Sequence, residues 1–256
     1  MEGVIRKFLL LLICSSTFLH AQVLNVNYQL KAGNSTIHLG DSFLANGNWY
    51  RLDECKFYAG VLPISTHKKS KFDWRLIDFS NPESLNQRYP FAKKLDKVLF
   101  GFGVDSITQV SSMFKADLDP IHGMYWTWQS GYIQLKIECT ALGSKLQENH
   151  AVQLHIGGFM SPHKSNFLDT LDLQKLLPLG TDSLCVVFDV AGFLAGVQVA
   201  RIADAKANNL VLQGADLLSF KIMSPSKWSN IAVEVWRNNI GIKALPTEVE
   251  SQDLGD

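Results

Sequence analysis

The chain has 256 residues, 46% of them hydrophobic, and its 24 basic and 24 acidic side chains give a formal net charge of zero. This composition suits one sizeable globular domain with its own hydrophobic core. Because there is no basic excess and no clustered Lys/Arg face, we do not expect the chain to bind nucleic acid.

The first residues read as a targeting segment. A basic pair at positions 6–7 precedes an apolar run, Phe8 to Phe18, and Ala21 offers a small residue for cleavage. This is the pattern of a secretory signal peptide, and the run is too short and wrongly flanked for a membrane span. We therefore expect a signal peptide over residues 1–21 and a single exported domain over residues 22–256. The expected location is the periplasm of a Gram-negative envelope, or outside the cell.

Export makes the cysteines informative, because exported proteins fold in an oxidising compartment. Once Cys14 is removed with the signal peptide, Cys55, Cys139 and Cys185 remain. Each lies at or near the end of an apolar strand pattern, which favours a small buried hydrophobe. The alternative is a Cys55–Cys139 disulfide that leaves Cys185 unpaired.

Short alternations of apolar and polar residues, separated by Gly- and Asn-rich turns, run through most of the chain. This period of two indicates half-buried strands. The expected strands cover residues 23–30, 36–39, 49–64, 72–79, 97–104, 133–139, 152–156 and 183–190. A polar loop joins the strands at 133–139 and 152–156, so we expect a hairpin there.

One segment has a clear helical pattern. Ser224 can cap a helix that begins with Pro225, and apolar residues from Trp228 to Ile240 recur at helical spacing before Gly241. Residues 203–209 are only locally helical. Many short strands with one late amphipathic helix predict a mostly-β fold, namely a β-sandwich with a short C-terminal helix.

The hairpin region also carries the most suggestive donor side chains. His122 and Met124 precede Trp126, while His155 and His163 lie around the end of the second hairpin strand. Imidazole and thioether together make a donor set suited to Cu(I). The competing interpretation is structural, since a lone strand histidine is more often a hydrogen-bonded residue and Met124 and Trp126 are more often core.

Common enzyme motifs are absent from the sequence. It contains no nucleophile elbow, phosphate-binding loop, dinucleotide fingerprint or His-Glu-x-x-His. Asp117 and Asp119 are candidates for the carboxylate pair of a hydrolase, but carboxylates before a proline turn are more often turn residues. We therefore expect a protein that is not an enzyme.

Four stretches resemble a known family. The stretches are Phe102-Gly-Val-Asp-Ser106, Leu118-Asp-Pro120, Gly123-Met-Tyr-Trp-Thr-Trp-Gln-Ser-Gly-Tyr132 and His155-Ile-Gly-Gly158. Their order and spacing resemble those of the MbnP-like copper-binding family. Supporting matches upstream and downstream extend the resemblance over most of the exported chain. The resemblance implies a periplasmic or secreted, mostly-β protein with copper as its ligand. It also implies a partner, either a dihaem peroxidase-like tryptophan-oxidising enzyme or a copper-chelating peptide system.

The resemblance also implies a ligand chemistry. In the best-understood relatives, histidines bind copper together with a tryptophan oxidised to kynurenine, which stands two residues before a ligating histidine. This chain has no Trp-x-His, so the copper site as those relatives build it is expected to be incomplete or displaced. The ligand hypothesis is His155 with His122, and Met124 or His163 as auxiliary donors. The aromatic residues that shield the metal or become oxidised are then Trp126 and Trp128.

A metal-free function is the alternative. An exported β-sandwich can bind a carbohydrate or a protein partner by stacking an exposed tryptophan on it, and Trp49, Trp74 and Trp126 are the candidates. Exposed tryptophans would favour this module, whereas a buried Trp126 beside converging histidines would favour copper.

Overall fold

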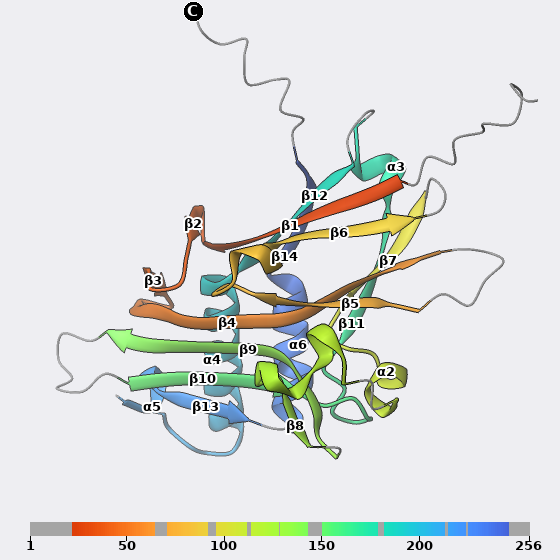
Figure 1. Ribbon diagram of the computed structural model, residues 1–256. Coiled ribbons are helices and arrows are strands. Elements are labelled where there is room, and N and C mark those ends of the chain that lie inside the picture. The colour runs from red at the N-terminus through yellow and green to blue at the C-terminus, as the bar shows by residue number, and fades with distance from the viewer. Residues whose placement is uncertain are drawn as a thin grey trace, which may run out of the picture.

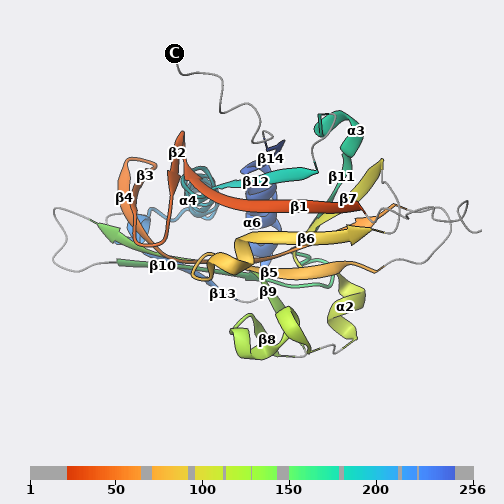
Figure 2. The same ribbon diagram turned by 45° about the horizontal axis from the view of Figure 1, so that its top comes forward.

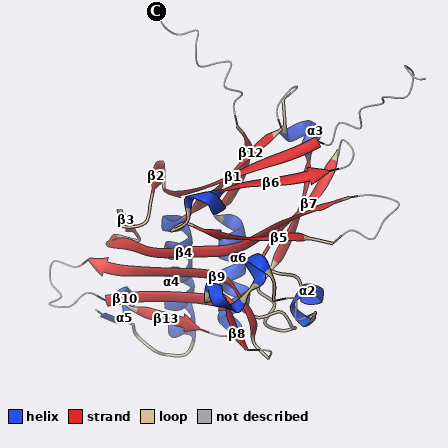
Figure 3. Cartoon of the chain, viewed as in Figure 1, coloured by secondary structure: helices blue, strands red, loops and turns tan. Residues whose placement is uncertain are grey.

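The computed structural model describes residues 22–64, 71–91, 96–111, 114–127, 129–142, 150–178, 182–212, 215–223 and 225–245. Strands dominate this part of the chain, which confirms the expected mostly-β fold (Figures 1 and 3). The expected signal peptide and Trp128 lie outside the described residues. Within those ranges, no helix is long and apolar enough to cross a bilayer.

The smaller of two sheets is built around β1. Its neighbour on one edge is β12, which runs parallel to it and places Asn25 opposite Ser183, and β14 continues beyond β12. The other edge of β1 pairs with both β2 and β6. The strands of this sheet are β1 (Gln22–Ala32), β2 (Ser35–Ile37), β6 (Asn86–Phe91), β12 (Ser183–Asp189) and β14 (Ile240–Ala244).

The larger sheet is built around β4 (Asn48–Pro63). One edge of β4 pairs with β3 and then β5, and the other edge pairs with β9 and then β7. The hairpin predicted from the sequence is confirmed, because β9 and β10 pair in antiparallel register. The remaining strands are β3 (Ser42–Ala45), β5 (Asp73–Asp78), β7 (Lys97–Phe102), β8 (Tyr125–Thr127), β9 (Gly131–Leu142), β10 (His150–Gly157), β11 (Phe167–Asp172) and β13 (Phe220–Met223).

The main core lies between the two sheets. Figure 2 shows β1, β6 and β12 as one layer and β4, β9 and β10 as the other, with α6 (Lys227–Asn238) reaching across both. Trp236 of α6 is fully buried, and its ring lies 5.7 Å from Phe57 of β4 and 6.4 Å from Phe188 of β12. This helix therefore closes the sandwich by placing its largest side chain between the layers.

The helices agree with the sequence only in part. The predicted C-terminal helix is present, but its cap is Ser226, whose hydroxyl accepts from the Trp228 N–H at 3.2 Å. The helix ends at Asn238, so Ile240 and Gly241 belong to β14. A second long helix, α4 (Val190–Ala207), extends well beyond the stretch expected to be helical. The shorter helices are η1 (Pro82–Leu85), α2 (Ser106–Val110), η2 (Ala116–Leu118), η3 (Pro120–His122), α3 (Leu173–Leu176) and α5 (Ala215–Leu218).

A second apolar cluster lies on the outer face of the larger sheet, away from β1. The segment from α2 to β8 covers it, and Figure 2 shows this segment beneath the larger sheet. We call this group the outer cluster, and its buried members are Tyr58, Trp74, Leu76, Val104, Leu118, Met124, Tyr132 and Ile133. The outer face is therefore apolar at one end, next to the polar residues described below.

All three cysteines expected in the exported chain are free and buried. The alternative of a Cys55–Cys139 disulfide is therefore wrong, although the two lie on adjacent strands with Leu52 opposite Cys139. Burial raises the pKa of both thiols, and each also lies near other acidic groups. Both behave as small core residues.

Candidate functional site

One row of side chains crosses five strands on the outer face of the larger sheet. Lys56 of β4 has Asp78 of β5 and Lys136 of β9 as its register partners. His155 of β10 stands opposite Lys136, and Met223 of β13 stands opposite His155. The residues that alternate with them, such as Leu154 and Ile222, face the main core. We call these five residues the outer row: Asp78, Lys56, Lys136, His155 and Met223.

Carboxylates of the next row connect these side chains into a ladder of ion pairs. Glu54 lies 3.1 Å from Lys56 and 2.7 Å from Lys136, measured between charged atoms. Asp78 lies 3.2 Å from the Lys56 ammonium. Glu138 is 3.7 Å from Lys136 but only 2.7 Å from the His155 ring, so the histidine is its closer partner.

The ladder mixes charges of both signs. Three carboxylates (Asp78, Glu54 and Glu138) face two ammonium groups (Lys56 and Lys136), and the exposed Lys221 of β13 lies on the same face of the sheet. The paired side chains are 12% to 27% exposed, so water screens them only in part. His155 stands at the open end of the ladder, next to Glu138.

Burial and pairing oppose each other along the ladder, and pairing prevails. Burial alone would raise the pKa of Glu54, but hydrogen bonds from Lys136 and Lys56 lower it. Burial would also raise the pKa of Asp78, and bonds from Ser80 and Lys56 lower it. The pKa of Lys56 is raised because Glu54 and Asp78 outweigh the effect of burial. These groups stay charged through the neutral range.

His155 has the geometry of a ligand held by a carboxylate. Its Nε2 lies 2.7 Å from Glu138 Oε1, and its Nδ1 has no hydrogen-bond partner among the described residues. A carboxylate on one ring nitrogen fixes the tautomer and leaves the lone pair on the other nitrogen, as is usual for metal-bound histidines. The arrangement therefore presents Nδ1 as a free donor.

Trp126 lies beside this histidine. The Trp126 ring covers Gly157, where an ideal Cβ would come within 2.6 Å of its Cζ3 atom. His155 and Gly157 point to the same face of β10, about 6.6 Å apart along the strand. Trp126 is partly buried and packs against the outer cluster. The Trp126 ring thus covers the position that follows His155 on the outer face of β10.

The other predicted donors lie in different surroundings. Met124 is fully buried in the outer cluster, and His122 is exposed with its Nε2 3.0 Å from the Ala116 carbonyl. His163 lies in the loop after β10 and has a buried Nδ1 without a hydrogen-bond partner. Among the described residues, no hydrogen bond or ion pair joins His155 to any of these three. That part of the chain also holds no group of three or more His, Cys, Asp or Glu side chains that could bind a metal.

Two residues beside His155 were missed from the sequence. Met223 was not considered because residues 220–223 were not expected to form a strand beside β10. Glu138 was treated only as a polar residue of the alternating pattern. Only the pairing of β10 with both neighbours brings Glu138 and Met223 next to the histidine.

The carboxylate pair considered for a hydrolase serves the local structure. Asp117 Oδ2 accepts from the Leu76 N–H at 3.0 Å, which ties η2 to β5. Asp119 caps η3 by accepting from the Ile121 N–H at 2.9 Å. Both carboxylates therefore have a role as hydrogen-bond acceptors for the backbone.

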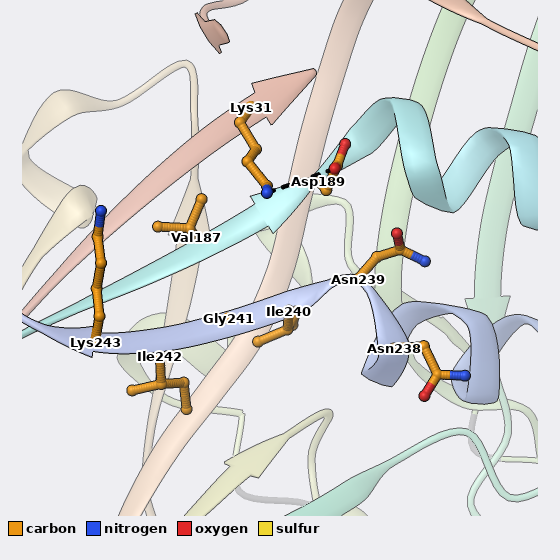
Figure 4. Close-up of a pocket in the computed structure, with 9 residues that line it drawn as sticks. All are labelled: Lys31, Val187, Asp189, Asn238, Asn239, Ile240, Gly241, Ile242 and Lys243. Carbon is orange, nitrogen blue, oxygen red and sulfur yellow. Dashed lines mark ion pairs between the residues drawn. The ribbon is translucent and has the colours of Figure 1, made fainter. Parts of the chain in front are cut away.

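Two pockets among the described residues lie away from His155. A cavity of about 400 Å³ on the smaller sheet is lined mainly by β14 and neighbouring residues, with Lys31 paired to Asp189 at 3.6 Å and Lys243 apart from them (Figure 4). A groove of about 490 Å³ runs along β3 and the start of α4. Trp49 lines this groove and is 53% exposed, whereas Trp74 is buried and donates to Asp105 Oδ2 at 2.8 Å.

The fold and this site define a class: a two-sheet, mostly-β protein whose outer face presents a carboxylate-bound histidine beside a tryptophan. The chain belongs to the MbnP family, whose model matches residues 21–211. The solved structure of MbnP from Methylosinus trichosporium is similar at 17% identity and a TM-score of 0.46, over 69% of this chain and 78% of that one. The comparison with curated proteins finds no match.

Proposed function

We propose that this MbnP-family chain is an exported copper-binding protein that holds copper at His155. It carries or sequesters the metal and performs no reaction on it. The observation that supports this most strongly is the 2.7 Å contact between His155 Nε2 and Glu138, with no hydrogen-bond partner for Nδ1 among the described residues.

The donor set fits copper in part. His155 supplies an imidazole, and Trp126 provides a neighbouring apolar surface that keeps water from one side. Soft or borderline donors of this type bind copper better than they bind hard cations. The buried and unpartnered His163 Nδ1 follows the same strand and is the auxiliary donor of the proposed site. Met124 and His122 are not included, because one is packed in apolar surroundings and the other is bonded to a carbonyl.

The proposed location is the periplasm or the medium, which follows from the apolar run after Arg6-Lys7 and from family membership. There, a carrier needs a partner that delivers, removes or uses copper. The family resemblance supplies the proposal of a tryptophan-oxidising dihaem enzyme or a copper-chelating peptide for that role.

The test is copper analysis and intact mass of the chain purified from its own envelope, followed by anaerobic titration with Cu(I). We expect near-stoichiometric binding by the native protein and a large loss in His155→Ala. His38→Ala is the matched control, because His38 is a surface histidine paired only with Asp41. A metal-free protein that takes up no copper, or equal affinity in His155→Ala, would refute the proposal.

A second candidate function has one observation in its favour. Trp49 and Leu44 are register partners on β4 and β3, and both are about half exposed beside the groove (53% and 52%). An exposed indole with the polar residues Ser42 and Asn46 nearby suits stacking on a sugar ring. Titration with soluble oligosaccharides of glucose and of N-acetylglucosamine, followed by tryptophan fluorescence, tests this. Saturable quenching that Trp49→Ala abolishes would support sugar binding at this groove, and a lack of quenching would exclude this candidate function.

A further inference from the structure

We propose that Met223 is the sulfur donor of the His155 site, and that its thioether selects a monovalent soft cation, Cu(I), over divalent ions. The inference rests on the proposed function, because it assumes that His155 binds copper. It adds a thioether ligand that lies 68 residues further along the chain than the histidine.

The register of β10 and β13 brings the two donors together. Their parallel pairing matches Leu154 with Ile222 and His155 with Met223. Since Leu154 and Ile222 both face the main core, His155 and Met223 both face outward. Neighbouring strands lie about 4.8 Å apart, and Met has three rotatable bonds, so its sulfur can reach an ion held at His155 Nδ1.

Met223 is not a core residue. It is 44% exposed, because the alternation of β13 buries Ile222 and places Lys221 and Met223 on the outer face. A thioether at the surface gains little from burial. As a neutral soft donor, it favours Cu(I) and offers little to hard oxygen-seeking cations.

The carboxylate beside His155 also suits a cation. The Glu138 carboxylate balances the ion through the imidazole without being a ligand.

The site then has an order of contacts across the sheet. Glu138 holds Nε2 of His155 on one side, Met223 approaches from β13 on the other, and Trp126 covers Gly157 on the apolar side. Imidazole and thioether donors next to an aromatic ring describe a site for a soft ion.

The experiment compares the full exported chain with Met223→Leu and Met160→Leu. Leu keeps the volume and apolar character of Met but removes the sulfur, and Met160 is an exposed methionine (60%) in the loop after β10. Affinity for Cu(I) is measured by anaerobic competition with bicinchoninate, and affinity for Cu(II) by competition with glycine. Thermal unfolding of each variant checks that the fold is retained.

We expect Met223→Leu to weaken Cu(I) binding at least about tenfold, since even outer-shell changes cost 10- to 100-fold. Cu(II) affinity and Met160→Leu should stay within about twofold of the unchanged chain, a difference of about 0.4 kcal/mol. X-ray absorption of the Cu(I) form should show a sulfur neighbour that Met223→Leu lacks.

The outcomes separate the two proposals. If the unchanged chain binds Cu(I) through His155 but Met223→Leu binds equally well, the thioether assignment is wrong and the copper function stands. If Met160→Leu causes the loss, the sulfur donor comes from the loop and the assignment is again wrong. If the unchanged chain binds no Cu(I), the proposed function itself fails.

Discussion

The ring of Trp126 occupies the space in which a side chain at Gly157 would stand. An ideal Cβ on Gly157 would lie 2.6 Å from Trp126 Cζ3 and 2.9 Å from the Tyr132 carbonyl oxygen. One contact is with a large ring and the other with backbone, so neither neighbour can move easily. The absence of a side chain at Gly157 is what allows Trp126 to lie against β10 next to His155.

Gly157→Ala should therefore destabilise the fold by about 1–3 kcal/mol, the usual effect of forcing a methyl group into a packed site. The measurement is the urea unfolding free energy. Gly241→Ala is the control, because it is also a strand glycine but has open space where the Cβ would stand, and we expect a change within about 0.5 kcal/mol. Equal effects of the two substitutions would contradict the close packing of Trp126.

Acid should weaken the outer-face ladder. The lowered pKa values of Glu54 and Asp78 mean that their contribution to stability is fully present above the unfolded values, about 4.3 and 3.9, and is lost as pH falls through the folded values. We therefore expect the free energy of unfolding, measured from pH 7 to pH 3, to decrease once the pH is below about 4.

Glu54→Gln separates this ladder from the other carboxylates. At pH 7 it should cost about 2 kcal/mol, between the values of surface and buried ion pairs, because it leaves Lys136 and Lys56 with one carboxylate fewer. The gap from the unchanged chain should narrow as pH falls toward 3. A gap that stayed constant over that range would show that Glu54 does not titrate as described.

Trp236 should be the most costly tryptophan to remove. Trp236→Ala leaves a cavity between Phe57, Phe102 and Phe188, and we expect a loss of about 3–5 kcal/mol. Trp49→Ala, at a position that is 53% exposed, should change stability by about 0.5 kcal/mol or less. Thermal and urea unfolding of both variants give the comparison, and similar losses would argue against α6 as the element that closes the core.

The cysteine thiols should be slow to react in the folded state. Cys55 and Cys139 are buried and their pKa values are raised, so the reactive thiolate is both scarce and inaccessible. With Ellman's reagent we expect little colour from the native chain and release from Cys55, Cys139 and Cys185 after denaturation without reductant. Fewer thiols in the denatured chain would indicate a disulfide.

The sequence predicts the parts of this fold that depend on local pattern. The alternation over residues 133–139 and 152–156 is enough for the hairpin, because each strand has one core face. The start of helix α4 was not predicted, because its apolar residues form no single stripe. Its buried residues include Val190, Phe193, Leu194 and Val197. Buried helical runs of this kind resemble buried strands in sequence.

The surroundings of His155 depend on contacts that a single sequence does not reveal. Imidazole, thioether and indole groups can be identified as donors and shields from their types alone. Strand register decides which of these side chains meet. The pair His155–Met223 joins strands that are far apart in the sequence, and the pair Lys56–Asp78 joins strands separated by a loop. This is why Met124 is a core residue and Met223, outside any expected strand, lies beside the histidine.

The parallel pairing of β1 with β12 has a consequence for the life of the chain. Residues of β1 leave the ribosome well before their partners on one edge, from Ser183 to Asp189. Pairing between such distant segments slows folding, because a large loop must close before any contact forms. The export proposed above would benefit from this delay, since a chain that crosses a membrane through a translocon has to stay unfolded until it has passed.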